Sequence, residues 1–73
     1  MAIPRTEPKS SNVLWFEHNG DTLTVQFKSG RYEHYGVPDE DAQKMLRVHE
    51  ADGSVGSFYH QNIKGKYETK KVA

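Results

Sequence analysis

An Asn19-Gly20 pair between two apolar runs restricts the fold of this chain more than any other feature. Both residues tolerate the positive φ angles of a type I′ turn, so the pair is a strong signal for a β-hairpin. With Asn19 and Gly20 as a two-residue loop, Phe16 would lie opposite Leu23. Ser29-Gly30 predicts a second turn of the same length. These two turns predict a three-stranded antiparallel meander over residues 10–35.

The second turn would place Val25 opposite His34 and Thr24 opposite Tyr35. Side chains alternate along strands, so each face of the sheet can be assigned. The predicted core face consists of Leu14, Phe16, Leu23, Val25, Phe27, Tyr32 and His34. The predicted outer face includes Val13, Trp15, Thr24, Lys28, Arg31 and Tyr35, with Trp15 in line with Tyr35 across Thr24.

Two helices are predicted after the meander. The first opens at Pro38, where three consecutive acidic residues complement the helix dipole, and it ends near Gly53. Its inward stripe would consist of Ala42, Met45, Leu46 and His49. Ser54 can cap a second helix, and Gly65 marks its end. The predicted fold class is α+β, a three-stranded antiparallel meander followed by two helices packed on one face (β-β-β-α-α).

The chain of 73 residues is long enough for one domain. We expect an extended N-terminal arm over 1–9, a domain over 10–68 and a basic tail over 69–73, with Tyr67 folded back onto the core. The absence of cysteine excludes disulfides and cysteine zinc sites. No apolar run approaches the roughly 20 residues of a membrane span. We therefore expect a cytoplasmic monomer without a membrane contact.

The residues that carry most catalytic or metal chemistry show no motif here. The four histidines, at 18, 34, 49 and 60, lack the spacing of a helical metal pair. His34 is predicted to be a hydrogen-bonded histidine of the core. Ser57, His60 and Asp52 could lie near one another, but no nucleophile-elbow motif surrounds them. We expect no cofactor, no metal and no enzymatic activity.

The outer face offers the strongest functional signal. Aromatic rings with interleaved cations can stack bases and contact phosphates. Trp, Tyr and Arg are also enriched in the hot spots of protein interfaces. A third reading is structural, with the second helix or the N-terminal arm covering Trp15. The predicted partner-binding residues are Val13, Trp15, Thr24, Lys28, Arg31 and Tyr35.

Several short strings follow one another in the order of a known family. They are Ser10-Ser11-Asn12-Val13, Leu23-Thr24-Val25-Gln26-Phe27 with Gly30, Tyr32-Glu33-His34, Val37-Pro38, and Gly56-Ser57-Phe58-Tyr59-His60-Gln61-Asn62-Ile63-Lys64 with Tyr67. Over residues 10–68 they resemble the KTSC domain family, named from a C-terminal extension of some lysyl-tRNA synthetases. His34 departs from the family's Tyr-x-Tyr motif. The resemblance implies a stand-alone bacterial or phage protein, for which RNA binding has been suggested.

By length and content the chain is also similar to a small lytic-phage protein that regulates host transcription. That resemblance implies binding to the β′ subunit of bacterial RNA polymerase, inhibition of promoter-specific initiation, and antitermination as a further activity. It would place the protein in the host cytoplasm. The alternative is a small RNA-binding accessory module. The balance of 10 basic against 10 acidic residues favours a protein partner, because nucleic-acid binders normally present a basic surface.

Overall fold

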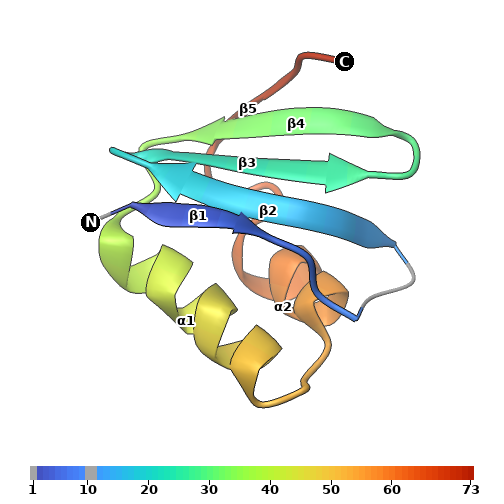
Figure 1. The fold of residues 1–73 in the computed structure, drawn as a ribbon. Coiled ribbons are helices and arrows are strands. Elements are labelled where there is room, and N and C mark those ends of the chain that lie inside the picture. Colours follow the sequence, from blue (N-terminus) through green and yellow to red (C-terminus); the bar gives the residue numbers. More distant parts are fainter. Residues whose placement is uncertain (1, 10–11) are drawn as a thin grey trace.

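The computed structural model describes residues 2–9 and 12–73, which form a five-stranded antiparallel sheet with two helices on one face (Figure 1). The strands are β1 (Ile3–Thr6), β2 (Val13–Asn19), β3 (Thr22–Phe27), β4 (Gly30–Tyr35) and β5 (Glu68–Lys71). The helices are α1 (Asp39–Glu50) and α2 (Val55–Asn62). Strand order in the sheet follows chain order, with both helices inserted between β4 and β5.

The predicted order β-β-β-α-α is wrong because both ends of the chain add a strand. The expected N-terminal arm contains β1, which pairs with β2 and places Ile3 opposite His18. The expected basic tail contains β5, which pairs with β4 and places Glu68 opposite Tyr35. Pro4 lies within β1, which is an edge strand, and proline within a sheet is largely confined to such strands. These two edge strands extend the predicted three-stranded meander to a sheet of five strands.

Both hairpin registers differ from the prediction. The loops are residues 20–21 and 28–29, so Phe16 lies opposite Val25 and Leu23 lies opposite His34. Gly20 has a φ of 66°, whereas the φ of Asp21 is not positive. A positive φ at only the first loop residue, here a glycine, is the pattern of a type II′ turn. Each pairing is displaced by two residues, and a displacement by an even number leaves every side chain on its predicted face.

An irregularity between Val13 and Trp15 exchanges two side chains at the start of β2. Val13, predicted on the outer face, is 1% exposed, whereas Leu14, predicted in the core, is 44% exposed. A bulge adds a residue to one strand, so alternation is interrupted there and resumes beyond it. The prediction is therefore wrong for these two residues and correct for Phe16, Leu23 and Val25, which are fully buried.

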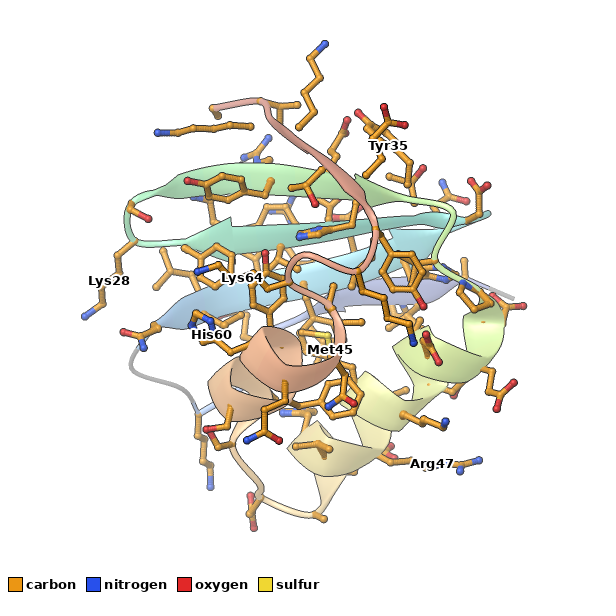
Figure 2. All side chains as sticks on the ribbon, turned by 180° about the vertical axis from the view of Figure 1, so that it is seen from behind. Lys28, Tyr35, Met45, Arg47, His60 and Lys64 are labelled. Atoms are coloured by element: carbon orange, nitrogen blue, oxygen red, sulfur yellow. The ribbon has the colours of Figure 1, made fainter. Side chains whose placement is uncertain are left out.

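The core lies between the sheet and the two helices. Its buried apolar residues are Ile3, Val13, Phe16, Leu23, Val25, Val37, Ala42, Met45, Val55, Tyr59 and Ile63. Figure 2 shows Met45 between the helical layer and the sheet. As predicted, Ser54 caps α2, accepting a hydrogen bond from the backbone N–H of Ser57 at 3.1 Å. Neither described helix is long and apolar enough to cross a membrane.

Two histidines are completely buried in this core. His34 was predicted there, but His18 was not assigned to either face. The Nε2 atom of His18 donates a hydrogen bond to the carbonyl of Val37 at 2.8 Å. Its Nδ1 atom lies 3.4 Å from a carboxylate oxygen of Asp39. His18 therefore connects β2 to the start of α1.

Candidate binding surfaces

The outer face of the sheet carries a tryptophan whose ring is approached by two arginines. Trp15 lies opposite Gln26, which lies opposite Arg31, so the three form one row across β2, β3 and β4. The guanidinium carbon of Arg31 is 5.1 Å from the Trp15 ring centroid, and that of Arg5 is 3.9 Å from it. Both are cation–π distances. We call Arg5, Trp15 and Arg31 the arginine clamp.

The clamp agrees with the sequence in part. Trp15 and Arg31 were predicted to share the outer face, and the structure brings them within cation–π distance of each other. Arg5 was missed because it lies on β1, and no periodic sequence pattern predicted that strand. Trp15 is half-buried, and the Arg5 guanidinium lies over its ring. The third reading, in which the N-terminal segment covers Trp15, is therefore correct in part. Arg31 is further fixed by donating from Nε to the side-chain oxygen of Gln26 at 2.9 Å.

The other predicted partner-binding residues are dispersed. Thr24 lies opposite Glu17 and Glu33, so it does not join Trp15 to Tyr35, which stands further along β4. The Tyr35 hydroxyl donates to a carboxylate oxygen of Glu33 at 2.8 Å, and this hydrogen bond raises the pKa of Tyr35. The prediction of an in-line Trp15–Tyr35 pair is wrong because it depended on the displaced register.

Two predicted residues leave the outer face altogether. Val13 belongs to the core, as described above. Lys28 lies in the β3–β4 turn, where it lines a groove on the helical side of the sheet. Alternation assigned Lys28 wrongly to the outer face, because β3 ends at Phe27, one residue before Lys28. The outer-face candidate site is therefore reduced to the clamp and its polar neighbours.

A groove of about 700 Å³ separates the β3–β4 turn from α2. It is lined by Asn12, Phe27, Lys28, Ser29, Tyr32, Gly56, Tyr59, His60, Lys64, Gly65, Tyr67 and Thr69. These residues come from four parts of the chain, which explains why sequence patterns did not bring them together. Half of the chain's eight aromatic residues gather here. A smaller hollow of about 380 Å³ adjoins it and shares Asn12, Gly56 and His60 with it.

Tyr59, which lines the groove, is hydrogen-bonded to the buried His34 behind it. The Nδ1 atom of His34 donates to the carbonyl of Leu23 at 3.1 Å, because a carbonyl can only accept. In the neutral ring, Nε2 is then the acceptor for the Tyr59 hydroxyl at 2.7 Å. This confirms the prediction of a hydrogen-bonded core histidine. Burial lowers the pKa of His34, and the hydrogen bond to Leu23 opposes that effect.

This buried histidine predicts a pH-dependent stability. The pKa of His34 is about 6.5 in the unfolded chain and lower in the folded chain. As the pH falls below about 6.5, the unfolded chain therefore binds a proton at His34 before the folded chain does. The free energy of unfolding should therefore decrease between about pH 7 and pH 5. Urea denaturation of wild type and of His34→Gln, which cannot titrate, measures the difference in slope. A slope that His34→Gln leaves unchanged would contradict the assignment.

Tyr67 ties the rim of the groove to α1. Its ring packs against the core, as predicted, and its hydroxyl donates to a carboxylate oxygen of Asp41. Burial, followed by this hydrogen bond, raises the pKa of Tyr67 to about 12. The same hydrogen bond lowers the pKa of Asp41, and the Lys66 ammonium 3.5 Å away acts in the same direction. The segment between α2 and β5 is thus fixed against the first helix.

The residues considered for catalysis do not form a catalytic pair. Asp52, Ser57 and His60 all line the smaller hollow. The Ser57 hydroxyl, however, is hydrogen-bonded to Ser54 at 3.0 Å rather than to His60, which would have to act as its base. Among residues 2–9 and 12–73, no three His, Asp or Glu side chains gather in a way that could hold a metal ion.

Comparison with known proteins identifies the family of this fold. The KTSC domain model matches residues 9–67. The crystal structure of a KTSC domain protein from Yersinia pestis is similar over 100% of both chains, with a TM-score of 0.83 and 29% sequence identity. No curated protein matches the chain. The resemblance seen in the short sequence strings is therefore confirmed, and the chain belongs to the KTSC domain family.

Proposed function

We propose that this protein regulates bacterial transcription by binding RNA polymerase through the outer face of its sheet. The observation that carries the proposal is the arginine clamp on that face. Both helices pack on the opposite side, so neither covers Trp15 (Figure 1). Tryptophan and arginine are the residue types most enriched in interface hot spots. The choice of polymerase, of its β′ subunit, and of inhibited initiation with antitermination rests only on the resemblance in length and content to a small lytic-phage regulator, which the comparisons do not show.

The charges around the clamp favour a protein over RNA on this face. Glu17 lies 3.6 Å from Arg5, and Glu33 occupies the next row along β4 from Arg31. The two cations are thus accompanied by two carboxylates, which would repel a phosphate backbone. A nucleic-acid footprint normally carries an excess of basic residues. A mixed rim around a large aromatic residue is instead typical of protein interfaces.

Removal of the tryptophan should abolish most of the polymerase affinity. Trp15→Ala should cost at least about 2 kcal/mol of binding free energy, or roughly thirtyfold in Kd. Titration of labelled protein with purified RNA polymerase measures the change, and pull-down with subunit mapping tests for β′. Thr22→Ala, on the outer face but outside the clamp, should bind like wild type. Melting curves of both variants show whether the fold is retained.

RNA on the same face is the competing outcome. If RNA binds there, affinity should fall steeply with salt, by a log–log slope of about −0.7 for each phosphate neutralised on a single strand. Titration of polymerase and of single-stranded RNA at two salt concentrations separates the two cases. Tight RNA binding that Trp15→Ala abolishes, together with no polymerase complex, would overturn the proposal.

A further inference from the structure

The groove between the β3–β4 turn and α2 is positively charged, although the chain as a whole has no net charge. Its twelve lining residues include Lys28 and Lys64 and contain no Asp or Glu. Neither lysine forms an ion pair with any described residue, whereas Lys44 and Lys66 do. Figure 2 shows both lysines on the same side of the molecule as His60. The groove therefore presents two uncompensated cations and favours an anionic ligand.

The walls of the groove add flat apolar surface to this charge. Phe27 and Tyr32 are half-buried, and their rings meet edge to face with centroids 5.8 Å apart. Phe27 also meets Tyr59 edge to face at 5.0 Å. Rings held by their neighbours in this way keep a fixed orientation and lose little entropy when a ligand stacks on them. Aromatic rings alternating with cations are the recognition surface for bases and phosphates of single strands.

The length of the surface distinguishes a strand from a single nucleotide. The smaller hollow continues the groove past Asn12, Gly56 and His60. It contains a further cation, Lys9, although Asp52 also lines it. The two hollows together run from the β3–β4 turn to the loop between α1 and α2. One nucleotide would occupy only part of this path.

We propose that this groove binds a single strand of nucleic acid, with bases against Tyr32 and its neighbours and phosphates against Lys28 and Lys64. The site lies on the opposite side of the sheet from the arginine clamp. It does not depend on the polymerase proposal, and the two can fail separately. An acidic peptide would satisfy the lysines alone, so the contribution of the aromatic ring decides between the two ligands.

The test measures fluorescence anisotropy of labelled oligo(U) and oligo(dT), each about ten nucleotides long, at about 50 mM and 200 mM salt. The double variant Lys28→Glu/Lys64→Glu should weaken binding at least about tenfold and reduce the salt slope by about 1.4, which is 0.7 for each of two lost phosphate contacts. Tyr32→Leu, which keeps an apolar side chain but removes the ring, should weaken binding about tenfold.

Two controls place the site. Arg47→Glu reverses an exposed cation on α1, which Figure 2 shows away from the groove, and it should bind within about twofold of wild type. Trp15→Ala should likewise bind oligonucleotides like wild type. The proposal is overturned if neither oligonucleotide binds, if mononucleotides compete as well as strands do, or if a poly-glutamate peptide binds equally well. It is also overturned if Arg47→Glu or Trp15→Ala weakens binding as much as the double lysine variant.

Discussion

Phe16→Ala should lower the free energy of unfolding by about 3–5 kcal/mol, the usual cost of removing a core phenylalanine. Phe16 is fully buried in β2, opposite Val25, and its ring meets that of His49 edge to face at 6.3 Å. A domain of this size rarely has more than about 3–5 kcal/mol in total. The variant should therefore be largely unfolded at room temperature, which circular dichroism and urea denaturation would show.

Two further substitutions test the burial that the structure gives to side chains in β2 and β3. Leu14→Ala, at a side chain that is 44% exposed, should change stability by less than about 0.5 kcal/mol. Phe27→Ala, which the sequence alone predicts to cost as much as Phe16→Ala, should cost less because Phe27 is half-buried at the groove. If Leu14→Ala destabilised the domain as strongly as Phe16→Ala, the irregularity at the start of β2 would be contradicted.

The alternation of side chains predicted the faces of the sheet better than the turns predicted its register. Phe16, Leu23, Val25 and His34 are all buried as expected. Their cross-strand partners are not those expected, because an Asn-Gly or Ser-Gly pair fixes a loop only to within a residue. The face survives a displacement of two residues, whereas contacts across the strands do not. The wrong register also led to the wrong prediction that Trp15 and Tyr35 lie in line on the outer face.

The edge strands could not be predicted from local pattern. The four residues of β5 are all exposed, so burial imposes no alternation on them. They are held by the β4 ladder and by the backbone of Arg31, which exchanges hydrogen bonds with Val72 and Ala73. Gly30 permits this close approach, since a Cβ there would lie 2.7 Å from the Ala73 carbonyl oxygen. Such long-range contacts leave no periodic signal in the sequence.

The same reasoning separates the two candidate surfaces. Trp15 and Arg31 are brought together by neighbouring strands, so alternation alone placed them on one face. The groove combines a hairpin turn with α2 and the segment before β5, and only the tertiary packing assembles it. Tyr59 in its lining is hydrogen-bonded to His34, which is 25 residues away in the chain. Sequence reasoning found His34 but had no means of finding its partner.

Met45→Ala should destabilise the domain by about 2–5 kcal/mol, the second large effect that we expect. Met45 is fully buried on α1 and lies between the helices and the sheet (Figure 2). Met45→Leu conserves volume and should cost less than about 1.5 kcal/mol. Arg47→Ala, at an exposed position of the same helix, should change stability by less than about 0.5 kcal/mol.

This series also separates stability from binding. Met45 lines neither the groove nor the outer face, because α1 contributes no residue to the larger groove and Trp15 lies across the sheet. The fraction of Met45→Ala protein that remains folded should therefore bind oligonucleotides with wild-type affinity. Equal urea midpoints for Met45→Ala and Arg47→Ala would show that α1 does not pack on the sheet through Met45. A loss of affinity beyond the loss of folded protein would show that the groove depends on the position of α1, through its contacts with α2 and the link between Asp41 and Tyr67.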